Sequence, residues 1–117
     1  MLKTYEEYKS LIIAKIEEYQ GELAALSDYI ADHPEISGEE YETSRVIVEL
    51  LRRHGCQVEY PFAGRDTAFR GVFGDNRRQH KVAILTEYDA LPDIGHACGH
   101  CLSGAISILA ALALREL

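Results

Sequence analysis

Acid, imidazole and thiol groups are concentrated in one short stretch of the sequence, residues 87–101. Cys98 and His100 offer a sulfur and a nitrogen, which zinc and similar ions accept as ligands. Glu87 and Asp89 offer carboxylate oxygens a few residues earlier. Asp89 could instead hold a ligating imidazole through its second ring nitrogen, the usual support for a metal-bound histidine. The residue types therefore predict a metal site in this stretch.

The elements on either side of this stretch should place it at the end of a strand. Residues 82–85 are continuously apolar, which is typical of a strand covered on both faces, so we predict a central strand over 81–87. Residues 102–114 are rich in Ala and Leu and predict a buried helix. Two further strands are predicted over 57–60 and 67–73, between segments rich in Gly, Asp, Asn and Arg. Loops at the carboxyl ends of strands are where α/β proteins bind ligands.

Two helices are predicted before the strands. Apolar and aromatic residues recur at steps of three and four, which indicates one face of a long first helix. These residues are Tyr5, Tyr8, Ile12, Ile16, Tyr19, Leu23, Leu26 and Ile30. The helix should end before Pro34, because proline disfavours helical geometry in the residue that precedes it. Ser37 followed by Glu40 matches a capping box that opens a second helix, which should end at Gly55. The expected fold class is α/β, with two N-terminal helices, a small mixed sheet and a buried helix after the metal loop.

Composition limits the classes of partner. The chain has 117 residues, 47% hydrophobic and 26% charged, which is typical of one folded domain or part of one. Its formal net charge of -7 argues against nucleic acid or an anionic membrane as the main partner. The first residues lack the apolar core of a signal peptide, so we expect a cytoplasmic location. Three cysteines, an odd number, argue against a disulfide framework in such a chain.

The motif residues resemble a known enzyme family. Residues 87–92, Glu-Tyr-Asp-Ala-Leu-Pro, followed by residues 95–100, Gly-His-Ala-Cys-Gly-His, resemble the M20 amidohydrolases. The similarity is strongest to the branch with aminobenzoyl-glutamate hydrolases and related dipeptidases. The opening helices, the His33-Pro34-Glu35-Ile36-Ser37 stretch and the helix after Cys101 also look like that family's N-terminal segment.

This resemblance implies a two-metal hydrolase, using Zn or Mn, that cleaves amide bonds in N-acyl amino acids, dipeptides or similar conjugates. Cys98 and His100 match metal-ligand positions of the family, and Asp89 matches the acidic position that supports the metal centre and is the catalytic candidate. Glu87 is a weaker candidate beside it. The metals of such enzymes polarise the carbonyl and activate a water, whose proton a glutamate takes.

The same resemblance implies that residues 1–117 form only part of a catalytic domain. The family's general base, its other ligands and its dimerisation domain would lie beyond Leu117, so we expect the chain to be inactive alone. Apolar surfaces left uncovered should promote self-association. Cys101 departs from the family, which more often has Asp or Asn at this position.

Two other functions remain open. The Cys98 to Cys101 spacing at a helix start resembles the thioredoxin-like thiol-disulfide oxidoreductases, in which the helix lowers the pKa of the first thiol. The long loop before Ala97 and the two opening helices fit that class poorly. In a non-enzymatic alternative, Cys98 and Cys101 would be half of a structural zinc site completed by another chain. His96 is as compatible with a structural loop role as with a site role. Cys56, His33, His54 and His80 are interpreted as structural.

Overall fold

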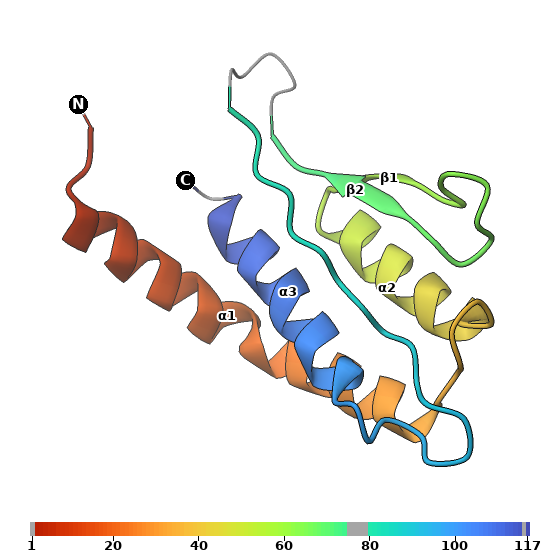
Figure 1. Ribbon diagram of the computed structural model, residues 1–117. Helices are drawn as coiled ribbons and strands as arrows, with labels where there is room; N and C mark the ends of the chain where they lie inside the picture. The colour runs from red at the N-terminus through yellow and green to blue at the C-terminus, as the bar shows by residue number, and fades with distance from the viewer. Residues whose placement is uncertain (1, 75–79, 116) are drawn as a thin grey trace.

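The computed structural model describes residues 2–74, 80–115 and 117, and it is a mixed α/β structure measuring 53 × 29 × 21 Å (Figure 1). In chain order, the described elements are α1 (Tyr5–Asp32), α2 (Tyr41–Arg53), β1 (Gln57–Glu59), β2 (Arg70–Val72) and α3 (His100–Leu114). Both predicted N-terminal helices are present, and the predicted last helix begins two residues early, at His100. None of the described helices combines the length and the apolarity needed to cross a bilayer.

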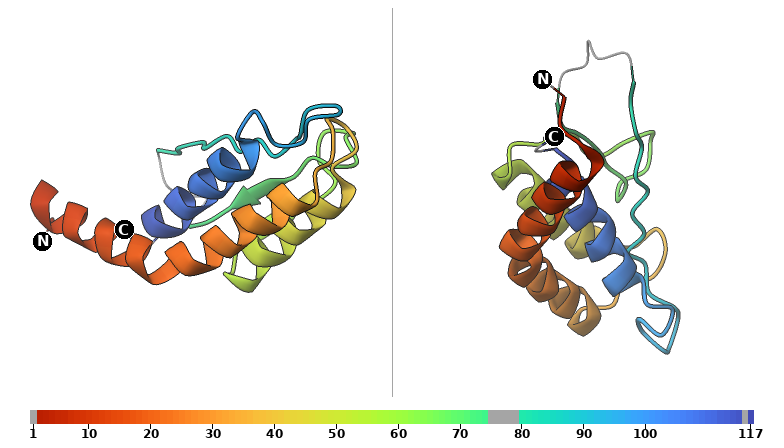
Figure 2. Two further views of the ribbon diagram at one scale, coloured as in Figure 1. Left: turned by 90° about the horizontal axis from the view of Figure 1, so that it is seen from below. Right: turned by 90° about the vertical axis from the view of Figure 1, so that its left-hand side faces the viewer.

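The first helix is buried only in its C-terminal half. It begins with a capping box, in which Glu7 N donates to Thr4 Oγ1 at 3.2 Å and Thr4 N donates to Glu7 Oε2 at 2.8 Å. Of the predicted apolar face, only Leu23, Leu26 and Ile30 are fully buried. The N-terminal half projects beyond the other elements (Figure 2). The periodicity was thus a correct indicator of helix, but it did not indicate which turns have a partner to pack against.

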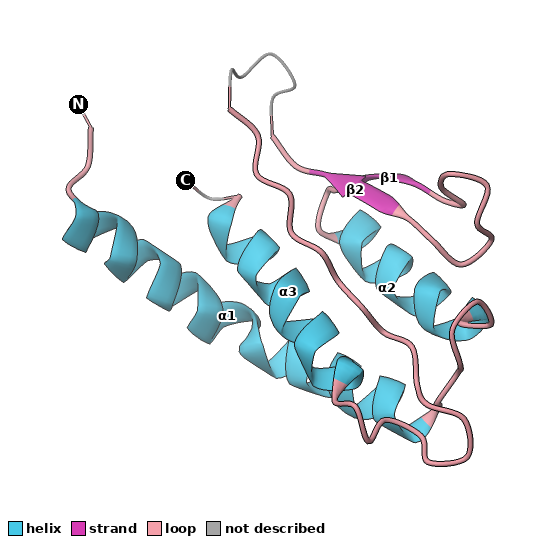
Figure 3. Cartoon of the chain, viewed as in Figure 1, coloured by secondary structure: helices cyan, strands magenta, loops and turns pink. Residues whose placement is uncertain are grey.

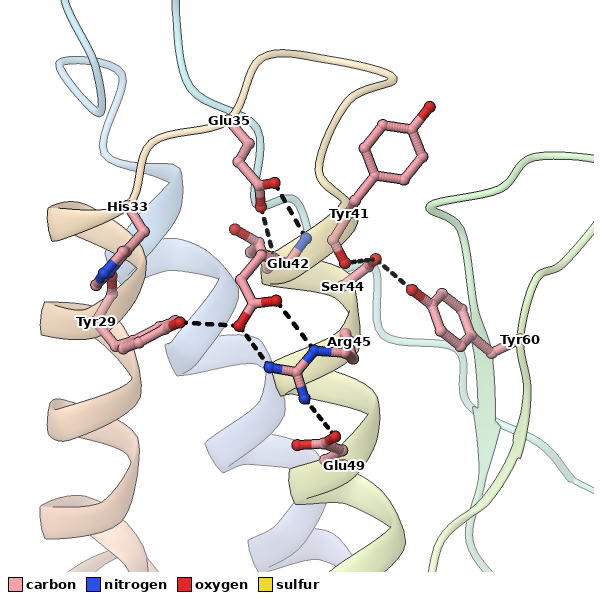
Figure 4. Close-up of polar contacts among 10 residues, drawn as sticks. Tyr29, His33, Glu35, Tyr41, Glu42, Ser44, Arg45, Glu49 and Tyr60 are labelled. Atoms are coloured by element: carbon pink, nitrogen blue, oxygen red, sulfur yellow. Dashed lines mark hydrogen bonds and ion pairs between the residues drawn. The ribbon is translucent and has the colours of Figure 1, made fainter.

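The start of α2 differs from the prediction. The helix begins at Tyr41, and its N-cap residue Glu40 makes no side-chain capping bond, so the predicted capping box is wrong. The Glu40 carboxylate instead accepts hydrogen bonds from Gly38 N and from Thr67 Oγ1, the second at 2.8 Å. Glu35 caps the helix, because its carboxylate accepts from the first-turn amides of Glu42 and Thr43 (Figure 4).

The sheet is smaller than predicted. Strands β1 and β2 form an antiparallel pair in which Val58 faces Gly71. A side chain at position 71 would displace its neighbour, because its Cβ would lie 2.8 Å from Cys56 Sγ. The predicted third strand, residues 81–87, is not part of this sheet, and the predicted mixed sheet is therefore wrong for the described residues. Those residues run as an extended loop between β2 and α3 (Figure 3). An apolar run indicates what a strand would bury, but a strand also needs a neighbour that pairs with its backbone.

The core lies where α1, α2 and α3 meet. Its buried residues are Leu23, Leu26, Ile30, Ile47, Leu50, Leu51, Cys56, Tyr88, Ala105, Ile108 and Leu112. Helix α3 packs along α1, and both views of Figure 2 agree on this arrangement. Only one face of α3 is covered, because Leu102 and Ile106 remain 57% and 55% exposed. The prediction of a buried helix is thus right for half of its surface.

Candidate metal centre

Asp89 and His100 form a direct pair at the end of the extended segment. His100 Nδ1 lies 2.8 Å from Asp89 Oδ1 and 3.1 Å from the Asp89 carbonyl oxygen. The other ring nitrogen, Nε2, lies 3.3 Å from Glu87 Oε2. Three of the residues singled out in the sequence are therefore neighbours in space.

Local backbone geometry places His100 at this point. Gly99 precedes α3 with φ 82°, a left-handed conformation that glycine adopts without strain. The Gly99 carbonyl accepts from the amides of Leu102 and Ser103, both at 3.0 Å, so the helix begins immediately after the turn. His100 is the first helical residue and faces the end of the extended segment. Leu91 N donates to Gly95 O at 2.9 Å, which closes the loop between Asp89 and the turn.

Cys98 lies at the same place but is more exposed. Its Sγ is 3.6 Å from the Asp89 carbonyl oxygen, and its thiol is free. Cys98 and His100 therefore both contact Asp89. Within residues 2–74, 80–115 and 117, however, no group of three or more His, Cys, Asp or Glu side chains is arranged to hold a metal ion.

The donor set nevertheless fits a metal ion in part. Asp89 holds Nδ1 of His100, the arrangement by which proteins orient a ligating histidine and leave its Nε2 for the metal. Thiolate and imidazole together suit zinc and related ions. The structure thus brings two candidate ligands, Cys98 and His100, next to Asp89.

The pKa values of the two histidines shift in opposite directions. Burial lowers the pKa of His100, but the hydrogen bond and the negative charge of Asp89 outweigh it, and the pKa is raised overall. Burial and the nearby His100 lower the pKa of His96. Both ring nitrogens of His96 are buried without a hydrogen-bond partner among the described residues. Burial and the neighbouring imidazole thus disfavour the charged form of His96.

Cys101 has a different environment from Cys98. It is partly buried and packs against the hydrophobic core, whereas Cys98 is exposed. All three cysteines are free thiols. Burial raises the pKa of the Cys56 thiol, which lies in the core beside β2.

Several residues that build the site were not predicted from the sequence. Ala90 N donates to Glu35 O at 2.7 Å, and Ile36 forms an isolated parallel bridge with Ala90. Tyr88, 9% exposed, donates its hydroxyl to the Thr67 carbonyl, and burial, together with the charge of Glu40, raises its pKa to about 12. Spacing offers no signal for such contacts, because they join segments far apart in the chain.

A pocket of about 280 Å³ lies next to Ala90, the residue that follows Asp89. Its lining residues are Pro34, Ile36, Ala90, Leu91, Asp93 and Gly95. They come from the α1–α2 connection and from the loop that follows Asp89. The pocket thus forms where these two segments meet.

Comparison with known proteins identifies relatives of the chain. No family model matches it. It is 39% identical to an Xaa-Arg dipeptidase of Mus musculus over 112 residues, covering 86% of the chain and 25% of that protein. It is 30% identical to a p-aminobenzoyl-glutamate hydrolase of Escherichia coli over 108 residues, covering 78% of the chain and 22% of that protein. N-acetyl-L-cysteine deacetylase of Bacillus subtilis is 29% identical over 134 residues, covering 99% of the chain and 30% of that protein.

The names of these relatives agree on one reaction type. They are a dipeptidase, an amide hydrolase and a deacetylase, which is the class that the motif at residues 87–100 predicts. The thioredoxin-like alternative for Cys98 and Cys101 has no support from them. The chain spans between a fifth and a third of the length of each of these proteins. The homologues of this chain are thus M20 family amidohydrolases, and the predicted resemblance to that family is confirmed.

Proposed function

We propose that this chain forms part of a metal-dependent amidohydrolase that cleaves an amide bond in dipeptides or N-acyl amino acids. The observation that carries the proposal is the 2.8 Å contact between Asp89 Oδ1 and His100 Nδ1. It orients the imidazole with Nε2 toward Glu87 and away from Asp89. A divalent metal would be held by His100 Nε2 and by the thiolate of Cys98.

The residues of the chain have separate roles in this proposal. Cys98 and His100 bind the metal, which when bound supplies Lewis-acid polarisation of the substrate carbonyl. Asp89 fixes the tautomer of His100 by accepting from Nδ1–H, and its negative charge makes the imidazole a better ligand. Glu87, with Oε2 3.3 Å from His100 Nε2, is available as a further oxygen ligand once the metal replaces that contact.

The chain by itself is proposed to be inactive. Amide hydrolysis at a metal needs a general base and enough ligands to retain the ion. Among residues 2–74, 80–115 and 117, no group of three or more His, Cys, Asp or Glu side chains is already arranged to hold a metal ion, so Cys98, His100 and Glu87 would need further ligands. The catalytic base and the remaining ligands would come from the portion of an M20 hydrolase that the chain does not span. Both zinc and manganese remain candidates for the metal.

Metal titration of the reduced protein tests this proposal. Co²⁺ is a useful probe, because a thiolate ligand gives it a distinctive charge-transfer absorption. We expect wild type to bind Co²⁺ with this absorption, Cys98→Ser to lose the absorption, and His100→Ala to lose most of the affinity. Cys101→Ser is the matched control and should bind as wild type does, because Cys101 packs against the core. Equal binding by all four proteins, or dependence on Cys101 in place of His100, would overturn the assignment.

Activity assays test the second part of the proposal. Wild type supplied with Zn²⁺ or Mn²⁺ should not hydrolyse dipeptides or N-acetyl amino acids above background. Measurable turnover that disappears in His100→Ala would show that the chain is sufficient for catalysis and would contradict the proposed division of the site.

A further inference from the structure

We infer that residues 33–36, the first part of the connection between α1 and α2 (residues 33–40), position the Asp89–His100 pair, and that Glu35 is the positioning residue that fixes this part of the connection to α2. The inference rests on the proposed function in treating the pair as a metal site. Its structural part, the coupling between Glu35 and the segment ending at Asp89, stands on contacts that do not involve a metal.

One side of the connection holds the site loop. Glu35 O accepts a 2.7 Å hydrogen bond from the amide of Ala90, the residue that follows Asp89. Ile36 and Ala90 form a parallel bridge, and Ala90 is only 3% exposed. Pro34 lies beside the same loop, since a Cβ at Gly95 would be 3.9 Å from its ring. The backbone on one side of Asp89 is therefore fixed by residues 33–36.

The other side of the connection is anchored to α2. Glu35 Oε1 accepts from Thr43 N at 2.6 Å, and Oε2 accepts from Glu42 N at 3.0 Å (Figure 4). These amides belong to the first turn of the helix, whose N–H groups have no partner within the helix. A carboxylate there is also stabilised by the partial positive charge of the helix N-terminus. Thr43 is fully buried, so this end of α2 is fixed in the core.

The distance along the chain distinguishes this cap from an ordinary one. Capping residues normally stand at the N-cap, immediately before the helix. Glu35 instead caps from seven and eight residues upstream. The backbone around Glu35 contacts Ala90, through the Glu35 carbonyl and the bridge at Ile36. One side chain thus connects the N-terminus of α2 to the backbone next to Asp89.

The Glu35 carboxylate does not contact the Asp89–His100 pair directly, so its effect on the pair is one of positioning. Both of its carboxylate oxygens are occupied by backbone amides, and the described contacts of His100 are with Asp89 and Glu87. Replacing Glu35 by Ala leaves its backbone carbonyl in place to accept from Ala90. Any effect of Glu35→Ala on the pair must therefore pass through the path of the connection.

The test combines amide hydrogen exchange at Ala90, the ¹⁵N resonances of the His100 ring, and Co²⁺ affinity. In Glu35→Ala we expect exchange at Ala90 to become about fivefold faster or more, in line with the loss of a helix cap. The His100 resonances should move toward those of an imidazole without the Asp89 contact. Co²⁺ affinity should fall about tenfold, as for other residues that orient ligands. Glu35→Gln keeps an acceptor oxygen and should give smaller changes in all three.

Two control variants separate positioning from general destabilisation. Ser44→Ala weakens the same end of α2 without changing Glu35, by removing the contacts of Ser44 Oγ with Tyr60 OH at 2.8 Å and with Tyr41 O at 3.2 Å. It should lower the unfolding midpoint by an amount similar to Glu35→Ala and leave Ala90 exchange and the His100 resonances unchanged under native conditions. Glu39→Ala removes an exposed glutamate of the same connection and should resemble wild type in every measurement.

The outcomes distinguish the inference from the proposed function. If Glu35→Ala accelerates Ala90 exchange and shifts His100 while Ser44→Ala does not, the positioning role is supported. If wild type then fails to bind Co²⁺, only the metal assignment is overturned. If Glu35→Ala and Ser44→Ala change Ala90 and His100 alike, Glu35 is an ordinary helix cap and the inference is wrong, whatever the metal affinity.

Discussion

The two halves of the segment that leads to the site have opposite environments. In residues 86–90, Thr86 Oγ1 donates to Gly104 O at 3.1 Å, Tyr88 is buried, and Ala90 pairs with Glu35. In residues 81–85 every residue is exposed, and none forms a hydrogen bond with the described part of the chain. Val82 and Leu85 are 84% and 87% exposed.

This difference shows that composition alone does not decide burial. The half that holds Val82, Ile84 and Leu85 is the more apolar in sequence, yet it is the uncovered half. The half that holds Thr86 and Asp89 is more polar, yet it is fixed on two sides, by α3 and by the α1–α2 connection. Whether a residue is buried depends on whether another segment packs against it. Its apolar character determines only how much free energy that packing would contribute.

The largest expected effect compares one apolar residue from each half. Tyr88→Ala should destabilise the fold by about 3–5 kcal/mol, the usual cost of removing a buried aromatic ring. Leu85→Ala should change stability by less than about 0.5 kcal/mol, because its side chain is 87% exposed. Urea unfolding followed by circular dichroism measures both. Similar losses in the two variants would show that residues 81–85 are buried in solution.

The next effect concerns Asp89, which lies in residues 86–90, and its partner His100. Asp89→Asn removes the negative charge that faces His100 Nδ1 but retains the size of the side chain. We expect metal affinity to fall about 10–100-fold, with the unfolding midpoint little changed. Isothermal titration with Zn²⁺ measures the affinity. Asp93→Asn, in the same loop and exposed, is the matched control, and an equal loss there would indicate a general charge effect.

A smaller effect is expected where α3 touches the fixed half. A Cβ on Gly104 would clash with the carbonyl oxygen of Glu87 and lie 3.2 Å from Thr86 Oγ1. Gly104→Ala should therefore destabilise the fold by about 1–3 kcal/mol, the usual cost of overpacking. Gly21→Ala in α1 meets nothing within 4 Å and should stabilise by about 0.5–1 kcal/mol. Thermal unfolding that moves both variants in the same direction would contradict the close approach of α3 to this segment.

The smallest effect on stability, but a clear one on association, is expected in the uncovered half. We propose that the exposed Val82 and Leu85, with the exposed face of α3, cause the chain to self-associate. The double variant Val82→Lys, Leu85→Lys should sediment with a lower average mass and bind less apolar dye, with stability within about 0.5 kcal/mol of wild type. Leu2→Lys, 89% exposed but at the N-terminus, should not change association. A monomeric wild type without dye binding would refute the proposal.

Local patterns predicted some elements well. The steps of three and four between Tyr5 and Ile30 predicted α1, and Pro34 predicted its end, because both depend on backbone geometry within a few residues. The motif residues Asp89, Cys98 and His100 were predicted as one site, and the structure brings them together around Asp89. Whether they bind a metal stays a prediction.

Other predictions failed because they depended on partners distant in the sequence. Ser37 and Glu40 have the spacing of a capping box, but Glu40 is bonded to Thr67 and the cap comes from Glu35. Residues 81–87 have the composition of a central strand, but no described strand pairs with them. The role of Glu35 had no sequence signal, because one carboxylate in a connection resembles any other.

The sequence by itself determined the presence of the three helices, the approximate positions of β1 and β2 and the residue types of the loop, because helical periodicity, strand composition and ligand type are local properties. Only the tertiary structure decided which face of α3 is covered, which half of the segment 81–90 is fixed, and which carboxylate caps α2. Each of these depends on a hydrogen bond or an apolar contact between residues far apart in the chain. Such contacts form only where the packed helices bring both partners to the same place.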